Sequence, residues 1–233
     1  MPRHARQVIA DIPYHVINRG NNHQTIFFHK DDYHFFLDAL ESAKEKYSCR
    51  IYSFILMPNH VHLLVESVKK ERNLADFMKY ISQRHGQYIN RRYRRTGTLW
   101  EGRFKSSPIS TDRYLLACSR YIEMNCVRAD MAKSPEEYEF SSYRTKIGLN
   151  KLEWLDFDPM YLALGVTQGE RQKKYEKWIQ ETIPEGEWGI IRKTIQRNWA
   201  FGSDEFTRKI ESILDRRFEI KKAGRKPKIN PKM

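Results

Sequence analysis

The stretch Met57-Pro58-Asn59-His60-Val61-His62-Leu63-Leu64-Val65 decides the fold of this chain. Residues 50–57 form an apolar-rich run typical of a strand, and Pro58-Asn59 favours a turn, so residues 60–66 should return as a second strand. Because side chains alternate between the two faces of a strand, Val61, Leu63 and Val65 should enter a core. His60 and His62 should then lie together on the opposite face. This hairpin is the centre from which the rest of the fold is predicted.

Strand and helix patterns alternate on both sides of the hairpin. Residues 13–18 and 104–109 have the composition of strands. Apolar residues spaced by three and four predict three helices: one capped by Asp31 or Asp32 that ends near residue 47, one over residues 74–89, and one capped by Thr111 or Asp112 that ends near Asn125. The order strand, helix, two strands, helix, strand, helix predicts an α+β fold, with one antiparallel sheet covered by helices.

The character of the sequence changes after residue 150. Residues 1–150 are predicted to form one domain, and residues 151–218 a helical C-terminal region with short helices at about 159–165, 169–182, 186–197 and 203–217. The turn at residues 198–202 could belong to a DNA-reading helix-turn-helix, but ordinary helical packing has the same sequence pattern. Residues 219–233 form a basic tail, which could clamp a hairpin stem.

Composition narrows the class of protein. The 233 residues include 42 Lys and Arg against 29 Asp and Glu, a formal net charge of +13 that suggests a polyanionic partner such as nucleic acid. No run approaches the roughly 20 apolar residues of a membrane span, and the N-terminus lacks the apolar stretch of a signal peptide, so a cytoplasmic protein without a membrane partner is expected. The three cysteines contain no CxxC pair and are expected to be reduced.

The positive charge is concentrated in two segments. Residues 79–105 contain eight basic residues and one acid, Glu101, and residues 216–233 contain eight basic residues and one acid, Glu219. The first segment also contains aromatic residues on which bases could stack. Either segment could bind nucleic acid. Alternatively, the first segment could be a solvated helix face and the second an ordinary basic tail.

Two histidines and one helix carry the candidate chemistry. His60 and His62, about 6.6 Å apart along the strand, could converge on one metal ion, or be one buried hydrogen-bonded histidine and one exposed one. On the helix that ends near Asn125, Tyr121 and Asn125 lie about 40° apart beside the apolar stripe, so Asn125 could offer a third ligand oxygen. A tyrosine on this helix could act as a nucleophile, but spacing alone does not choose between Tyr114 and Tyr121.

Several motifs in order resemble the HUH single-strand transposases that use one catalytic tyrosine, and among them most closely the REP-associated tyrosine transposases. These motifs are Val16-Ile17-Asn18-Arg19-Gly20-Asn21-Asn22, the segment from Pro58 to Leu64 that contains His60-Val61-His62, Gly97-Thr98-Leu99-Trp100-Glu101-Gly102-Arg103-Phe104-Lys105-Ser106, Asp112-Arg113-Tyr114-Leu115-Leu116 and Tyr121-Ile122-Glu123-Met124-Asn125-Cys126-Val127-Arg128-Ala129. The resemblance is dense over residues 1–148 and looser afterwards.

This resemblance implies a ferredoxin-like HUH nuclease domain and a role for each matching residue. His60, His62 and Asn125 would hold Mg²⁺ or Mn²⁺, and Tyr121 rather than Tyr114 would be the nucleophile. Tyr121 would attack a DNA phosphodiester to form a 5′-phosphotyrosine bond and release a 3′-hydroxyl that can later rejoin strands. The implied substrate is single-stranded DNA with a hairpin and a neighbouring guide sequence. No nucleotide cofactor is expected, and the protein could be a monomer or a homodimer.

Residues that could contact DNA follow from the same motifs and from the basic segments. Basic side chains are candidates for phosphate contacts, Arg19 and Asn21 for reading guide bases, and Trp100 for stacking on a base. Solvated surface or core packing is the alternative for each, and Arg128 could instead form an internal ion pair. The phosphate candidates are Arg91, Arg92, Arg94, Arg95, Arg103, Lys105 and Arg128.

The sequence departs from the family pattern just after Tyr121. Cys126 stands where a proline is usual, and Asp130 where a glycine is usual. Without the proline the helix could continue and shift Asn125, and the cysteine sulfur could lie beside the metal ligands. These two departures support one alternative, a catalytically weak, hairpin-binding regulatory protein on the same fold. Two further alternatives are a replication-initiator or relaxase type of HUH nuclease and a zinc hydrolase built on His60 and His62.

Overall fold

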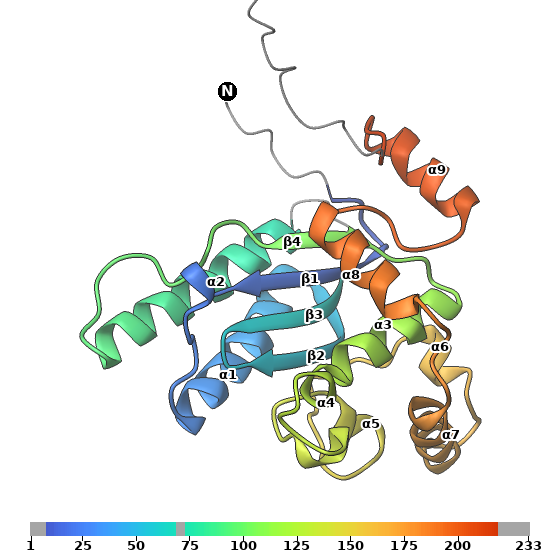
Figure 1. The fold of residues 1–233 in the computed structure, drawn as a ribbon, viewed down its shortest axis with the longest axis horizontal. Helices are drawn as coiled ribbons and strands as arrows, with labels where there is room; N and C mark the ends of the chain where they lie inside the picture. Colours follow the sequence, from blue (N-terminus) through green and yellow to red (C-terminus); the bar gives the residue numbers. More distant parts are fainter. Residues whose placement is uncertain (1–7, 69–72, 219–233) are drawn as a thin grey trace, which may run out of the picture.

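The computed structural model describes residues 8–68 and 73–218, and its centre is a four-stranded antiparallel sheet (Figure 1). The strands are β1 (Pro13–Arg19), β2 (Cys49–Met57), β3 (His60–Ser67) and β4 (Lys105–Pro108), in the order β2-β3-β1-β4. A strand-helix-strand-strand-helix-strand chain with this strand order is the ferredoxin-like arrangement. The predicted α+β fold with one antiparallel sheet is therefore confirmed.

The hairpin of β2 and β3 has the predicted alternation of side chains. Val61, Leu63 and Val65 are fully buried in the core on one face of the sheet. His62 lies on the other face, paired across the ladder with Ile17 of β1 and Ile55 of β2. Because β3 is paired on both sides, its backbone is held rigidly, and so is the face that carries the histidines.

Two helices, α1 (Lys30–Tyr47) and α2 (Asn73–Arg92), cover the face opposite the histidines (Figure 1). Asp31 and Asp32 were the expected caps of α1, but the residue that precedes the helix is His29. Asp32 lies in the first turn, where its carboxylate accepts hydrogen bonds from the backbone N–H groups of Phe28 (2.8 Å) and His29 (3.0 Å). An acidic residue at the third helical position can reach back in this way, so the expected N-terminal acid is present but is not the capping residue.

The helix α3 (Arg113–Glu123) packs on the face that carries the histidines. Asp112 caps it, as one of the two predicted alternatives, by accepting a hydrogen bond from the backbone N–H of Tyr114. The helix was expected to end near Asn125, but it ends at Glu123, and after Met124 a short helix α4 (Asn125–Arg128) follows. Asp130 has a φ of 54°. This left-handed conformation favours glycine and is tolerated by aspartate, so the departure at residue 130 is compatible with the local backbone.

The C-terminal residues add further helices around α3. Three of them, α5 (Tyr143–Lys146), α6 (Pro159–Leu162) and α7 (Gln168–Gln180), surround its outer side in a core that includes Leu116, Tyr161 and Tyr175. A fourth, α8 (Glu187–Arg197), lies beside α3 and packs against β1 and β4 (Figure 1). The remaining elements are η1 (Asn21–His23), η2 (Pro135–Glu137) and α9 (Asp204–Ile213). Residues 219–233, the predicted basic tail, lie outside the described residues.

The turn between α8 and α9 is bound to the end of the sheet. Asn198 ends α8 in a left-handed conformation with a φ of 54°. The backbone of Phe201 then pairs with the chain after β4, since its N–H donates to the Pro108 carbonyl and its carbonyl accepts from the N–H of Ser110. For this segment the sequence left two alternatives open, a helix-turn-helix and ordinary helical packing. In the structure the segment is joined to the sheet edge. Among the described helices none is long and apolar enough to cross a bilayer.

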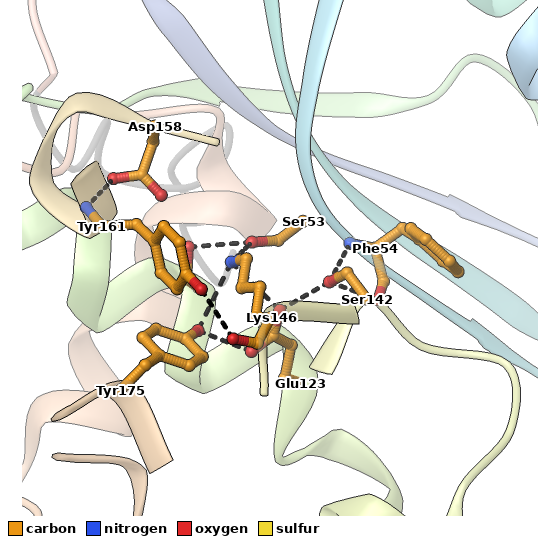
Figure 2. Close-up of polar contacts among 9 residues, drawn as sticks. Ser53, Phe54, Glu123, Ser142, Lys146, Asp158, Tyr161 and Tyr175 are labelled. Atoms are coloured by element: carbon orange, nitrogen blue, oxygen red, sulfur yellow. Dashed lines mark hydrogen bonds and ion pairs between the residues drawn. The ribbon is translucent and has the colours of Figure 1, made fainter. Parts of the chain in front are cut away.

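A buried polar network holds the C-terminal end of α3 (Figure 2). The fully buried Glu123 carboxylate lies 3.1 Å from the ammonium group of the fully buried Lys146. Ser142 and Tyr175 donate hydrogen bonds to the same carboxylate, over 2.5 and 2.6 Å, and Lys146 donates to Ser53 of β2 over 2.6 Å. The network therefore ties α3 to the sheet on one side and to α5 and α7 on the other.

Candidate functional site

A pocket of about 710 Å³ opens on the sheet face that carries the histidines. Its walls are the ends of β1, β2 and β3, the chain leading into β4, the end of α3 with α4, and α8. The lining brings together His60 and His62, which the sequence placed on a strand, and Tyr121 and Asn125, which it placed on a helix. The full set is Ile17, Asn18, Arg19, Met57, His60, His62, Glu101, Gly102, Arg103, Lys105, Tyr121, Asn125, Arg128, Ala129, Arg192, Ile195, Gln196 and Asn198.

The rings of His60 and His62 lie 5.0 Å apart between centroids, so both project from β3 on the same side. Nδ1 of His60 is 2.6 Å from Oδ1 of Asn59, and because that oxygen only accepts, Nδ1 carries the proton and Nε2 keeps its lone pair. Burial, with smaller contributions from the charges of Arg19 and His23, lowers the pKa of His60 to about 4. Burial also lowers the pKa of His62 well below 6.5, helped by its histidine neighbours. Both imidazoles are therefore neutral at pH 7, the form that binds metal ions.

His15 belongs to this site, although sequence reasoning missed it. Its Nε2 lies 2.8 Å from Nδ1 of His62, and the two rings stack with centroids 5.0 Å apart. The ring is fully buried, and burial lowers the pKa of His15 to about 3. With the Nδ1–H of His62 donated to His15, the Nε2 of His62 would be free for a ligand, an arrangement typical of metal-bound histidines. The available signal was the alternation of β1, which places residues 15, 17 and 19 on one face.

Tyr121 and Asn125 lie one turn apart on the wall formed by α3 and α4. The ring of Tyr121 is 5.6 Å from that of His15 and 6.0 Å from that of His62, between centroids. The amide nitrogen of Asn125 donates to the backbone carbonyl of Tyr121 over 3.4 Å, which leaves the Asn125 side-chain oxygen as an acceptor. Tyr114 does not line the pocket, and its ring packs against Phe201, with the centroids 4.9 Å apart.

The donor atoms of the pocket suit a divalent cation, and they would leave coordination positions of that cation open for a substrate oxygen. Two neutral imidazoles and one amide oxygen, from His60, His62 and Asn125, are three donors rather than a closed cage. The described residues contain no group of three or more histidine, cysteine and acidic side chains able to hold a metal ion, so the third donor here would have to be the amide. Cys126 is buried, and its sulfur donates to the Glu123 carbonyl rather than lining the pocket. The predicted approach of a soft sulfur to the ligands is therefore not found.

The pocket wall is strongly basic. It contains five basic residues and one acid, Glu101, a local balance of 5 − 1 = +4. Four of the basic residues, Arg19, Arg103, Lys105 and Arg128, were predicted to contact DNA, and the fifth, Arg192, was not singled out. Such a surface is complementary to a phosphate backbone.

Arg128 lies between two aromatic rings. Its guanidinium carbon is 4.5 Å from the ring centroid of Tyr121 and 4.5 Å from that of Trp188 in α8. The sequence left open whether Arg128 contacts a phosphate or forms an internal ion pair. The internal partners that the structure gives it are aromatic rings rather than acidic side chains. The stack joins α4, α3 and α8, so Arg128 connects the tyrosine to the C-terminal helices.

The other residues predicted to contact DNA do not line this pocket; they are Asn21, Arg91, Arg92, Arg94, Arg95 and Trp100. Arg92 pairs with Asp31 over 2.8 Å, and Arg95 donates to the side chain of Gln24. The indole of Trp100 is only 9% exposed, and its N–H donates to the Ser82 carbonyl over 2.8 Å. Stacking of Trp100 on a base would therefore require this ring to leave the core. Asn21 and Arg91 are exposed at the surface, outside the pocket.

Comparison with known proteins gives one family and one fold. The family described as "Transposase IS200 like" matches residues 8–125, just over half of the 233 residues. The solved structure of a REP-associated tyrosine transposase bound to a REP hairpin resembles this chain with a TM-score of 0.56 and 16% identity, over 67% of this chain and 92% of that one.

A second solved structure is much less similar. It is a candidate transposase from Deinococcus radiodurans R1, with a TM-score of 0.37 and 15% identity over 58% of this chain and 97% of that one. Comparison with curated proteins finds no significant match.

Proposed function

The chain belongs to the IS200-like transposase family, and on this premise we propose that it cleaves and rejoins single-stranded DNA with the hydroxyl of Tyr121 as the nucleophile. The single observation that carries the proposal is that Tyr121 lies beside His62 in a basic pocket, with ring centroids 6.0 Å apart. A related fold bound to a REP hairpin supports a hairpin-forming strand as the substrate.

The proposed reaction is a transesterification. The Tyr121 hydroxyl gives up its proton as its oxygen attacks the phosphorus of a phosphodiester, and the bond from phosphorus to the 3′-oxygen breaks. The 3′-oxygen takes up one proton and leaves as a 3′-hydroxyl, so no proton is gained or lost overall. The 5′-phosphate stays on Tyr121 as a phosphotyrosine diester. Reversal by a 3′-hydroxyl joins strands again without a nucleotide cofactor, because the covalent bond keeps the phosphodiester in an ester of similar energy.

The residues of the pocket support this reaction in different ways. Mg²⁺ or Mn²⁺, held by His60, His62 and Asn125, would withdraw charge from the phosphate. The guanidinium of Arg128 lies over the Tyr121 ring, 4.5 Å from its centroid, and so places a positive charge against the residue that attacks. Arg19, Arg103 and Lys105 can neutralise the neighbouring phosphates and hold the strand.

The test uses labelled hairpin oligonucleotides from repeats of the protein's own genome, incubated with the full chain and Mn²⁺. A covalent adduct that survives a denaturing gel and maps to Tyr121 is the expected result, and it should vanish in Tyr121→Phe and with a chelator. Tyr114→Phe is the matched control, since Tyr114 is on the same helix but outside the pocket.

Two outcomes would contradict the proposal. An adduct that maps to Tyr114 would mean that the nucleophile is wrong. Tight hairpin binding without an adduct, with metal bound, would favour the alternative of a hairpin-binding regulatory protein that retains the fold.

A further inference from the structure

The helix α8 forms a wall of the proposed active pocket, although it lies far beyond the family match at residues 8–125. Arg192, Ile195 and Gln196 line the pocket from this helix. Residues three and four positions apart share a face of a helix, so these three side chains form one pocket-facing stripe. The C-terminal region therefore contributes side chains to the same cavity as the histidines and Tyr121.

Three separate contacts hold α8 in this place. At its first turn Glu187 pairs with Arg120 of α3 over 2.9 Å, and both side chains are largely buried. Next to it, Trp188 stacks on Arg128, which also covers the ring of Tyr121. At its C-terminal cap the side-chain oxygen of Asn198 accepts a hydrogen bond from the backbone N–H of Ser106 in β4, over 2.9 Å. With both ends joined to the core, α8 is a fixed part of the pocket.

The charge of this stripe suits a phosphate. Arg192 is exposed and lines the pocket, and Gln196 one turn later adds an amide donor beside it. The sheet side of the pocket supplies Arg19 and Lys105, so basic side chains face the cavity from two different layers of the fold. A guanidinium binds phosphate oxygens through two parallel N–H groups, which a single amide or ammonium does not.

We propose that Arg192 binds a backbone phosphate of the DNA strand in the active pocket, so that α8 is part of the DNA-binding site. This rests on the proposed function, because the occupant of the pocket is taken to be that strand. A cavity of about 710 Å³ is in the range of small-ligand sites, which suits a few unpaired nucleotides rather than a duplex. The strand would pass between α8 and the sheet, next to Tyr121.

The experiment compares Arg192→Ala with Lys193→Ala in the full chain. Lys193 is the next residue of α8, is also exposed and has the same charge, but does not line the pocket. Affinity for a hairpin oligonucleotide with unpaired extensions is measured by fluorescence anisotropy over a range of salt concentrations, in a Tyr121→Phe background that prevents cleavage. Arg192→Lys tests whether a positive charge at this position restores part of the affinity.

We expect Arg192→Ala to weaken binding about tenfold and to reduce the slope of log affinity against log salt by about 0.7, the value for one phosphate contact on a single strand. Lys193→Ala should leave both values unchanged, and Arg192→Lys should recover most of the salt slope. Single phosphates in the unpaired extensions are then replaced in turn by uncharged methylphosphonates. At one position the replacement should weaken binding by the Tyr121→Phe protein but should not weaken further the binding by the same protein with Arg192→Ala.

Equal effects of Arg192→Ala and Lys193→Ala would overturn the proposal, because they would indicate a general effect of the charge of α8. Unchanged binding by Arg192→Ala, or additive losses at every methylphosphonate position, would overturn it as well. Failure of the proposed function is distinguishable: binding by the wild-type chain without a covalent adduct overturns the nuclease and leaves these comparisons valid. Absence of hairpin binding by the wild-type chain overturns both proposals.

Discussion

Removing one partner of the buried pair of Glu123 and Lys146 should strongly destabilise the fold, and Lys146→Met tests this. Both side chains are fully buried. Methionine replaces the long apolar part of the lysine and removes only the ammonium group, which lies 3.1 Å from the Glu123 carboxylate and donates to Ser53 over 2.6 Å. The variant therefore leaves a buried carboxylate without its cation but with the hydroxyl donors Ser142 and Tyr175.

The magnitude follows from the cost of an uncompensated buried charge. Removing one partner of a buried ion pair typically costs 3–5 kcal/mol, and since two hydroxyls still donate to Glu123 we expect a loss of about 3 kcal/mol. For a chain of this length that loss lowers the melting temperature by about 6–12 °C. The double variant Glu123→Gln/Lys146→Met has no buried charge at this place, and glutamine can still accept from both hydroxyls. It should recover about 2 kcal/mol relative to Lys146→Met.

The assay is urea unfolding of the full chain, followed by tryptophan fluorescence and far-ultraviolet circular dichroism. Lys151→Met is the matched control, because Lys151 pairs with Glu153 over 2.5 Å but both side chains are about three-quarters exposed. An exposed pair contributes 0–1 kcal/mol, so this variant should stay close to the wild type. A loss below 1 kcal/mol in Lys146→Met would contradict this prediction, and so would a double variant whose loss equals the sum of the losses in Glu123→Gln and Lys146→Met.

Three further predictions concern the histidines and the metal. His15→Phe removes the partner of the His62 Nδ1 atom and should weaken Mn²⁺ binding about 10- to 100-fold in a spin-resonance titration, whereas the exposed His34→Gln should not. Burial lowers the pKa of His60 and His85 to about 4, so the unfolded chain takes up protons below pH 6.5 that the folded chain excludes. Stability should be complete above pH 6.5 and fall towards pH 4, by about 2 kcal/mol per such histidine at pH 5, and a flat profile of unfolding free energy would contradict this. Imidazole donors favour Mn²⁺ over Mg²⁺, so Mn²⁺ should support adduct formation at least as well, and activity with Mg²⁺ alone would be the contrary result.

Local sequence patterns were enough to predict the main strands and helices of the fold. They also predicted two parts of the site, the histidine pair on the strand and the tyrosine with its neighbouring asparagine on the helix. Alternation in residues 60–66 correctly separates His60 and His62 from the core residues, and helical spacing puts Tyr121 and Asn125 one turn apart. The start of α1 differs from the prediction for a local reason: the carboxylate of Asp32 reaches back to the backbone N–H groups of Phe28 and His29, so Asp32 lies inside the first turn and is not the capping residue. At the end of α3 the chain interrupts the helix at Met124, and no local signal in the residues around it predicted that position.

The kind of protein can be predicted from the sequence: an α+β chain with paired histidines on a strand, a tyrosine helix and a large excess of basic residues. These properties depend on periodicity, residue type and order, which are local and need no knowledge of distant partners. Which side chains meet depends on how the helices and strands pack. His15 bonds to His62 because β1 lies beside β3, and Arg192 enters the pocket because α8 is joined to α3 and β4 at its two ends. Contacts between residues so far apart in the chain arise from packing of whole elements, which no short stretch of sequence encodes.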